Sequence, residues 1–251
     1  MESALDEGTP GETIVEVGAG LGVLTVELAR RAHRLVAVEV DRDLVAQLER
    51  RLSAFDNVSV VCADVLSLSP AQLLKRGGAS PPYAVVGNLP YNIAAPVLRH
   101  FLEADGPPTR LVVMLQREVA ASVASAPGRM SLLGVSVQIY GEAHVLFGVP
   151  PDAFYPPPKV RSSVVRIDVA PSPRAEIPGR ALFFEVVRAG FSAPRKQLRN
   201  ALAQGLSLPP AGAASLLGEA GVSPTQRAQE LSLEQWAALA TAWARRRPSA
   251  S

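Results

Sequence analysis

The residues with the clearest chemical potential are Asn88, Leu89, Pro90 and Tyr91, which directly follow an apolar run at residues 83–87. Such a run is typical of a buried strand, so these residues are expected at the end of a strand. The Asn88 carboxamide offers hydrogen-bonding groups, Pro90 fixes a turn, and Tyr91 presents an aromatic face. Together these groups suit a flat ring that carries an amine. The sequence therefore predicts a ring-binding site at this corner of the fold.

Three glycines, Gly18, Gly20 and Gly22, lie upstream, between the first predicted strand and the first predicted helix. Glycine lets a ligand approach the backbone closely, and the amides at the start of the following helix point toward it. Glu39 ends the second predicted strand, where an acid can hold ribose hydroxyls. Asp64 follows the third predicted strand, where a carboxylate can accept a hydrogen bond from an adenine amine. We therefore expect these residues to form the cofactor half of the same site.

The glycine segment leaves two cofactor classes open. A dinucleotide site usually carries G-x-G-x-x-G, whereas this chain has G-x-G-x-G and no second nucleotide-binding half after the fifth predicted strand. S-adenosylmethionine is therefore favoured over NAD. Taken singly, Glu39 could be a capping or ion-paired surface residue, and Asp64 a helix N-cap. Their places at successive strand ends, in line with Gly18 and Asn88, favour a binding role.

The elements that must position these residues alternate between strand and helix. Strands are predicted at residues 13–17, 34–39, 58–61, 83–87 and 111–115, and helical patterns at residues 23–32, 43–52 and 94–102. This alternation indicates βαβ units and a mostly parallel sheet. Further helices are expected at residues 117–125 and 131–140, followed by strands at residues 145–149 and 163–169. The last two strands are expected as an antiparallel hairpin at the sheet edge.

A proline-rich linker follows at residues 171–178. Beyond it only helices are predicted, at residues 180–189, 194–206, 211–220 and 233–247. The sequence therefore predicts an α/β domain at residues 1–170 and a small, all-helical domain at residues 171–251.

The composition limits the class of protein. A chain of 251 residues with 48% hydrophobic content can bury one sizeable core and a smaller second one. The single cysteine, Cys62, excludes an internal disulfide framework and fits a reducing compartment. No apolar stretch approaches the length of a membrane span, and no leader pattern opens the chain. A soluble cytoplasmic protein without membrane contact is therefore expected.

The net charge of +2 conceals an asymmetry between the two predicted domains. Residues 171–251 hold ten Lys/Arg and five Asp/Glu, whereas residues 1–170 hold fifteen and eighteen. A basic domain beside a mildly acidic one suggests that the basic domain contacts phosphate. A solvated basic surface is the alternative interpretation.

These motifs together resemble those of the ribosomal RNA adenine N6-dimethyltransferases. The matching segments lie at residues 16–22, 38–41, 63–66, 88–91, 154–163, 187–191 and 195–200. The resemblance runs from about residue 10 to the C-terminus. The glycine segment is shared with most methyltransferases, whereas the pairing of N-L-P-Y with F-x-P-x-P-K-V-x-S is far more specific.

The resemblance implies a Rossmann-like class I S-adenosylmethionine-dependent methyltransferase sheet with a small all-helical C-terminal domain. It implies methyl transfer to N6 of two adjacent adenines in a hairpin near the 3′ end of small-subunit rRNA, giving N6,N6-dimethyladenine. S-adenosylmethionine is the implied methyl donor, and no metal is expected. The implied partner is small-subunit rRNA in an immature 30S-type subunit, met by a monomer during ribosome maturation.

The resemblance also implies roles for individual residues. The Asn88 side-chain oxygen and the Leu89 carbonyl would accept the two N6 hydrogens, and Pro90 would stiffen the turn. Tyr91 and Phe154 would clamp an adenine that has been turned out of its helix. Core packing is the alternative role for these two aromatic residues. The implied cofactor-binding residues are Gly18, Gly20, Glu39, Asp64 and Asn88.

The implied RNA-binding residues are Arg188, Arg195, Lys196 and Arg199, on two neighbouring helices of the basic domain. Arg195 and Arg199 are four residues apart, so they are expected to share a helix face. Phosphate contacts are the implied role, and a solvated helix surface is the alternative.

One family segment, Gly-Gln-x-Phe-Leu, normally precedes the glycines and covers the methionine end of the cofactor, but it is not found here. Weak S-adenosylmethionine binding by this polypeptide is therefore expected. Two other functions remain open. One is a related large-subunit rRNA methylase that confers antibiotic resistance, against which Leu89 and the basic tail argue by resemblance. The other is a non-catalytic, RNA-binding assembly factor.

Overall fold

The computed structural model describes residues 12–247 and divides them into two compact units. The larger unit contains residues 12–120 and 142–169, and the helical unit contains residues 121–141 and the chain from residue 170 onward. The division expected from the sequence, at residue 170, placed residues 121–141 in the larger domain. The Gly-Gln-x-Phe-Leu segment of the family was looked for in the stretch before the glycines. Residues 1–11 of that stretch lie outside the described residues.

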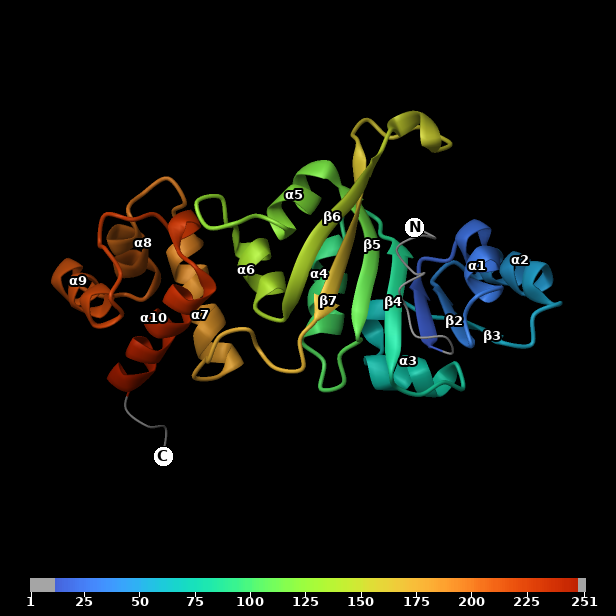
Figure 1. Cartoon of the computed structure of the whole chain (residues 1–251), viewed down its shortest axis with the longest axis horizontal. Coiled ribbons are helices and arrows are strands. Elements are labelled where there is room, and N and C mark those ends of the chain that lie inside the picture. The colour runs from blue at the N-terminus through green and yellow to red at the C-terminus, as the bar shows by residue number, and fades with distance from the viewer. Residues whose placement is uncertain (1–11, 248–251) are drawn as a thin grey trace. The chain divides into compact units, whose positions relative to one another are not determined.

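The larger unit is built on a seven-stranded sheet with the order β3-β2-β1-β4-β5-β7-β6 (Figure 1). The strands are β1 (Thr13–Val17), β2 (Arg34–Glu39), β3 (Val58–Cys62), β4 (Tyr83–Asn88), β5 (Arg110–Gln116), β6 (Gly141–Val149) and β7 (Ser162–Val169). The first five strands pair in parallel, and β7 pairs antiparallel with β5. The predicted alternation and the antiparallel edge are therefore confirmed.

The helices of this unit connect successive parallel strands. They are α1 (Val23–Ala29), α2 (Arg42–Leu52), α3 (Pro70–Arg76) and α4 (Ala94–Leu102), with short 3₁₀ turns η2 (Val65–Ser67) and η3 (Pro151–Ala153). Sequence analysis missed α3, although its start is marked by a capping box between Ser69 and Gln72 and by Pro70 at its first position. That combination is a helix-start signal.

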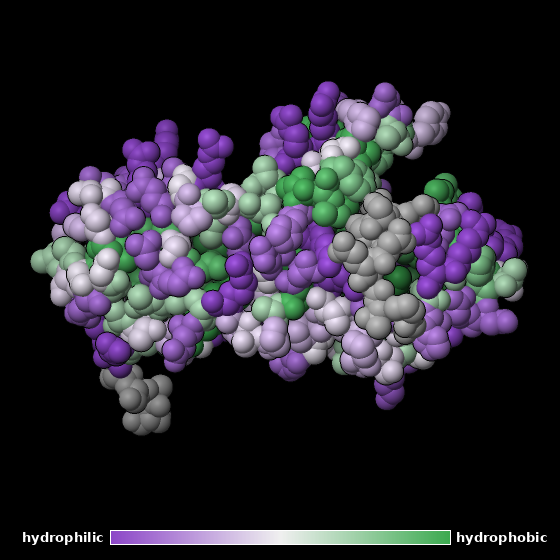
Figure 2. Space-filling model, viewed as in Figure 1, coloured by the Kyte–Doolittle hydropathy of each residue, from purple (hydrophilic) through white to green (hydrophobic). Residues whose placement is uncertain are grey.

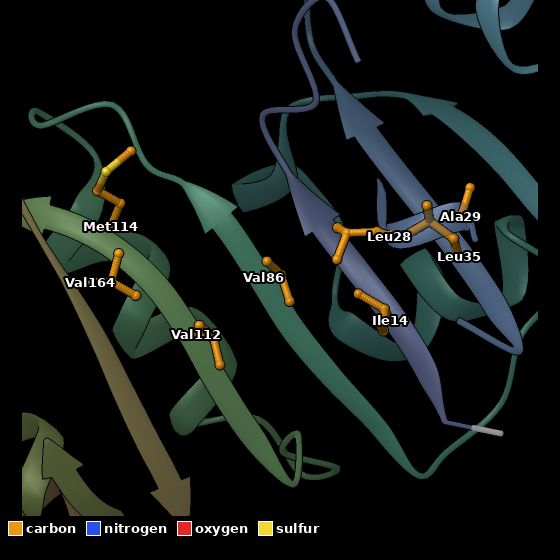
Figure 3. Packing of buried hydrophobic residues seen from close by; sticks show 8 residues of the cluster. All are labelled: Ile14, Leu28, Ala29, Leu35, Val86, Val112, Met114 and Val164. Atoms are coloured by element: carbon orange, nitrogen blue, oxygen red, sulfur yellow. The ribbon is translucent and has the colours of Figure 1, made fainter. Parts of the chain in front are cut away.

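One hydrophobic cluster lies on the face of the sheet that α1 covers (Figure 3). It joins β1, β2, β4, β5 and β7 through Ile14, Leu35, Val86, Val112, Met114 and Val164, and α1 adds Leu28 and Ala29. A parallel sheet buried on both faces requires continuous apolar strands. This requirement explains the apolar runs of the sequence.

The strand order reverses between β1 and β4, because the chain proceeds outward from β1 to β3 on one side and from β4 to β5 on the other. In parallel sheets, the carboxyl ends on either side of such a reversal frame a crevice that binds ligands. The fold therefore places the residues after β1 and β4 next to each other.

Strand β6 lies at the edge of the sheet and forms a hairpin with β7 (Figure 1). The loop at residues 150–161 connects the two strands. Val145, Leu146 and Phe147 of β6 are exposed by 39–46%. Figure 2 shows hydrophobic surface gathered over this part of β6. The hairpin thus leaves an apolar strand edge uncovered within the described part of the larger unit.

The helical unit packs around α7 (Arg180–Phe191). Its other helices are α6 (Leu132–Gln138), α8 (Leu198–Gly205), α9 (Pro210–Glu219) and α10 (Leu233–Arg246), with the 3₁₀ turn η4 (Ala228–Glu230), and the boundary helix α5 (Arg117–Val123) leads into it. Trp236 of α10 is fully buried, and its ring stacks on Phe191 with 5.5 Å between centroids. Within residues 12–247, none of the helices combines the length and the apolar character needed to cross a membrane.

The predicted helix at residues 194–206 is corrected by the structure, because α8 begins only at Leu198. Residues 192–197 form a turn. Gln197 is the N-cap residue of α8 and has a non-helical backbone (φ −59°, ψ 146°), so the helix begins after it. Arg195 and Lys196 therefore lie in the turn and not on a helix, so Arg195 does not share a helix face with Arg199.

The close approach of α7 and α10 gives a testable prediction. A Cβ added at Gly190 would lie 2.4 Å from the Trp236 ring, so Gly190→Ala should lower the free energy of unfolding by about 1–3 kcal/mol in spite of better helix propensity. Gly218→Ala on α9 is the matched control, because no atom lies within 4 Å of the added Cβ. It should leave stability unchanged or raise it by up to ~1 kcal/mol. Urea unfolding measures both, and equal effects would contradict the packing argument.

Candidate active site

A cavity of about 310 Å³ lies at the carboxyl end of β4 in the larger unit. Its walls come from two segments far apart in the chain. The lining residues are Asn88, Leu89, Pro90, Tyr91, Phe154, Tyr155, Pro156 and Pro158. The structure thus brings together all five residues that the sequence suggested for the target half, and it adds Tyr155 and two prolines.

Asn88 and Leu89 form the polar corner of this cavity. Asn88 is the last residue of β4 and is exposed, and no hydrogen bond from another described residue reaches its carboxamide. The Leu89 side chain is 1% exposed, which anchors the corner in the core. The Ile93 amide donates to the Pro90 carbonyl at 3.1 Å and closes the turn. The Asn88 side chain and the Leu89 carbonyl remain as acceptors for a ligand.

Tyr91 is half-exposed, and its position is fixed by a hydrogen bond. Its hydroxyl lies 2.9 Å from the hydroxyl of Ser162, which is 1% exposed at the start of β7. Sequence analysis did not single out Ser162, although it belongs to the proline-rich motif at residues 154–163. The bond spans 71 positions in the chain, so the spacing of residues gives no sign of it.

Phe154 combines both of the roles that were considered for it. It has an extended backbone (φ −121°, ψ 152°), it packs against the hydrophobic cluster, and it lines the cavity. One side of the Phe154 ring therefore packs against the core, and the other side faces the cavity.

The glycine segment adopts a backbone that favours glycine at each of its three positions. The φ values of Gly18, Gly20 and Gly22 are +74°, +56° and +77°. A Cβ at Gly22 would also lie 2.5 Å from Leu48 of α2. The Gly18 amide donates to the carbonyl of Val38 at 3.0 Å, which fixes the loop against β2. The loop is therefore held open to ligands at the end of β1.

Glu39 holds this loop in place from the end of β2. It is only 8% exposed, and its Oε2 accepts a hydrogen bond from the Gly20 amide at 2.8 Å. Its Oε1 accepts from the amides of Val40 at 2.8 Å and Asp41 at 3.0 Å. Glu39 is thus a buried residue that holds the glycine loop by a hydrogen bond, and it is not an ion-paired surface residue. A carboxylate has lone pairs beyond these three bonds, so it can still accept from a ligand.

Asp64 is exposed just beyond β3 and caps η2, because its Oδ1 accepts from the Leu66 amide at 2.9 Å. The N-cap alternative is therefore observed. The amide of the preceding residue, Ala63, donates to the Glu39 carbonyl at 2.9 Å, which keeps Asp64 near the end of β2. Among the described residues, none donates a hydrogen bond to Asp64 Oδ2.

The two halves of the site adjoin each other. Val17 and Gly87 are register partners in β1 and β4. A Cβ on Gly18 would lie 3.8 Å from the carbonyl oxygen of Asn88. A ligand on the glycine loop therefore lies beside the Asn88 corner.

Glu16 of β1 lies two residues before Gly18, and the sequence motif at residues 16–22 included it without a separate role. It is 2% exposed, and its Oε2 is buried with no hydrogen-bond partner among the described residues. Burial raises the pKa of Glu16 to about 7, the Thr25 hydroxyl opposes this shift, and the Glu39 carboxylate adds to it. An acidic residue inside a predicted buried strand, two residues before the first glycine, is the signal that could have identified it.

The donors and acceptors present fit S-adenosylmethionine. The left-handed glycine backbone admits a ligand, the strand-end carboxylates of Glu39 and Asp64 suit hydroxyl and amine groups, and the unpartnered Glu16 oxygen suits a cation. Among residues 12–247, no group of three or more His, Cys, Asp or Glu side chains is arranged to hold a metal ion.

The four basic residues suggested for RNA binding lie in the helical unit. Arg188 is exposed in the last turn of α7, and Arg195 and Lys196 are exposed in the turn before α8. Arg199 on α8 is half-buried, and its Nε has no hydrogen-bond partner among the described residues.

Comparisons with known proteins agree on one family. The sequence model of the family described as ribosomal RNA adenine dimethylase matches residues 3–245. A Dehalococcoides mccartyi protein named ribosomal RNA small subunit methyltransferase A is 44% identical over 227 residues, 90% of this chain and 77% of the relative. A Moorella thermoacetica protein of the same name is 40% identical over 237 residues, 92% of this chain and 82% of the relative.

Two solved structures share the fold. A 23S rRNA methyltransferase, ErmE, has a TM-score of 0.71 and 29% identity, covering 96% of this chain and 93% of its own. A dimethyladenosine transferase from Plasmodium falciparum has a TM-score of 0.74 and 19% identity, covering 92% of this chain and 89% of its own. The Rossmann-like methyltransferase fold is therefore confirmed.

The buried carboxyl group gives a second prediction. Because the pKa of Glu16 is raised from 4.5 to about 7 in the folded state, the stability tied to its protonated form is fully present below pH 4.5. That stability is lost as the pH rises through about 7. Glu16→Gln, which stays neutral, should therefore raise the free energy of unfolding by roughly 3 kcal/mol at pH 8 and by much less at pH 5.

Urea unfolding at the two pH values measures this difference. Glu49→Gln, on the exposed face of α2, is the control and should change the free energy of unfolding by less than ~0.5 kcal/mol at either pH. A Glu16→Gln effect of the same size at pH 5 and pH 8 would contradict the raised pKa.

Proposed function

Because the chain belongs to the ribosomal RNA adenine dimethylase family, we propose that it dimethylates N6 of two adjacent adenines in a hairpin near the 3′ end of small-subunit rRNA. The chain is an rRNA adenine methyltransferase that uses S-adenosylmethionine as methyl donor. The choice of these two adenines is the proposed part. The product would be N6,N6-dimethyladenine, formed during maturation of the small subunit.

The observation that carries this proposal is the cavity that joins Asn88 and Leu89 to two aromatic residues beside the glycine loop. Adenine N6 is a weak nucleophile, because its lone pair is delocalised into the ring. The Asn88 side-chain oxygen and the Leu89 carbonyl accept its two hydrogens, which favours a pyramidal nitrogen with an available lone pair. Proximity and orientation then account for most of the rate.

S-adenosylmethionine, when bound, supplies an electrophilic methyl group at the glycine loop. Gly18 and Gly20 let it approach the backbone, Glu39 and Asp64 accept from its hydroxyl and amine groups, and Asn88 lies where the two ligands meet. The proton that N6 loses passes to water, since no strongly basic group is needed after the transfer.

Tyr91 and Phe154 hold the adenine. Base–aromatic stacking contributes about 1–3 kcal/mol per base, which offsets part of the cost of turning the base out of its helix. Pro90 stiffens the corner, and the hydrogen bond between the Tyr91 and Ser162 hydroxyls sets the tilt of the Tyr91 ring.

Arg188, Arg195 and Lys196 are exposed cations of the helical unit, and we assign them phosphate contacts with rRNA. Arg199 of α8, which is half-buried, is assigned the same role. The partner is the immature small subunit, the protein acts as a monomer, and the compartment is the cytoplasm. The single thiol of Cys62 supports a reducing compartment.

The test incubates the protein with immature small subunits and labelled S-adenosylmethionine, and maps the modified positions by primer extension. Two adjacent dimethylated adenines near the 3′ end are expected. Modification of large-subunit rRNA would instead favour the antibiotic-resistance activity. Binding without transfer of label would favour a non-catalytic assembly factor.

The acceptor role of Asn88 gives a third prediction. Asn88→Ala should lower kcat for methylation by about 100-fold or more, because N6 loses the acceptor that orients it. Folding should not change, because the side chain is exposed. Asn92→Ala, an exposed asparagine that does not line the cavity, is the matched control and should keep its activity. Single-turnover rates measure both, and a fully active Asn88→Ala variant would disprove the assignment.

The hydrogen bond between Tyr91 and Ser162 gives a fourth prediction. Tyr91→Phe and Ser162→Ala each remove it, so each should lower kcat/KM by roughly 2- to 10-fold, the usual net value of one hydrogen bond. The double variant should be no worse than either single variant, because all three lack the same bond. Additive losses would show that the two hydroxyls act separately.

A further inference from the structure

Tyr155 follows Phe154 in the chain but lies in a different environment. Its relative exposure is 101%, so no described side chain covers it, although it lines the mouth of the cavity. Successive side chains of an extended chain point to opposite sides. Because Phe154 is extended and packs against the core, Tyr155 is directed away from the core and into solvent.

The loop that carries Tyr155 is suited to hold an exposed ring still. Three prolines, at residues 156–158, follow it directly and restrict the backbone. On the other side, Phe154 is fixed by its contact with the hydrophobic cluster. A ring presented in this way loses little conformational freedom when a ligand stacks on it.

Two cations accompany the ring. Lys159 and Arg161 are exposed in the same loop, and neither forms an ion pair or a side-chain hydrogen bond with a described residue. The Arg161 carbonyl accepts from the Arg117 amide at 3.0 Å, so this end of the loop is tied to the residue after β5. An exposed aromatic ring with exposed cations in the same loop is a pattern that binds single-stranded nucleic acid.

We propose that Tyr155, Lys159 and Arg161 form a second base-binding subsite, which takes the unpaired nucleotide next to the target adenine. The Tyr155 ring stacks on the base of that nucleotide, and the two cations contact its phosphates. This inference rests on the proposed function, in which the neighbouring nucleotide is the second adenine of the pair. While one adenine occupies the cavity, the other is stacked on Tyr155 at the mouth of the cavity.

The subsite explains why a third aromatic residue stands at a cavity where two are enough to hold one base. Tyr91 and Phe154 are held by contacts inside the protein, with Ser162 and with the core, whereas Tyr155 has none among the described residues. A ring without internal partners is available to a partner from outside.

The experiment uses the full chain and an RNA hairpin with the two adenines, in which 2-aminopurine replaces either the target or its neighbour. With the unmodified protein, fluorescence at both positions should change on binding. Tyr155→Ala should abolish the change at the neighbour, keep it at the target, and weaken RNA binding roughly 5- to 100-fold. Tyr155→Phe should restore all three readouts, because it keeps the stacking face.

One control variant and one further test show whether the effect belongs to the three proposed residues of this loop. Val160→Ala removes another exposed apolar side chain of the same loop and should change nothing. Lys159→Gln together with Arg161→Gln should reduce the slope of log affinity against log salt by up to about 1.4, if both cations contact phosphates of single-stranded RNA.

The outcomes separate this inference from the proposed function. If the unmodified protein methylates the hairpin and Tyr155→Ala leaves the neighbour's fluorescence and the affinity unchanged, the subsite is wrong and the function stands. If Tyr155→Ala disturbs the target position and lowers the single-turnover rate as well, Tyr155 belongs to the target pocket and the subsite is again wrong. If the unmodified protein binds the hairpin but does not methylate immature small subunits, the proposed function fails first.

Discussion

The close contact between the ends of β1 and β4 is the constraint on which the site depends. A Cβ at Gly87 would lie 2.8 Å from the carbonyl oxygen of Val17, so the strands can meet here only because this position has no side chain. The contact brings Gly18 beside Asn88, although 70 positions separate them in the chain. The proposed methyl transfer requires donor and acceptor to meet at one point, and we assign that point to this junction.

Two carboxyl groups, those of Glu39 and Glu16, lie at or next to this junction. Glu39 accepts hydrogen bonds from the Gly20 amide of the glycine loop and from the Val40 amide at the end of β2. Glu16, two residues before Gly18, is buried with an oxygen that has no described partner. A buried acid of this kind is costly when ionised, so it weakens the fold near neutral pH. The cost falls on the segment that must accept a cofactor, where strained and unsatisfied groups tend to concentrate.

Local patterns were sufficient to predict most of the sheet, and the family resemblance named five residues that line one cavity. Continuous apolar runs gave the parallel strands, because strands buried on both faces have no polar side. The contacts that refine the site escaped prediction because they link distant segments. The Tyr91–Ser162 bond and the Glu39–Gly20 bond depend on which strands lie side by side. The late start of α8 was a different failure, since helical spacing and a proline at the predicted start did not reveal that Gln197 is the N-cap.

The helical unit is assembled from two separate stretches of chain, and this has a consequence for protein engineering. Residues 121–141 pack with the C-terminal helices, and the Ala170 amide donates to the Tyr140 carbonyl at 2.8 Å. The Gly128 amide likewise donates to Gln229 at 2.8 Å. A chimera that exchanges the helical unit with that of a relative must therefore transplant both stretches. A fusion made at residue 170 alone would pair foreign helices with the native α6.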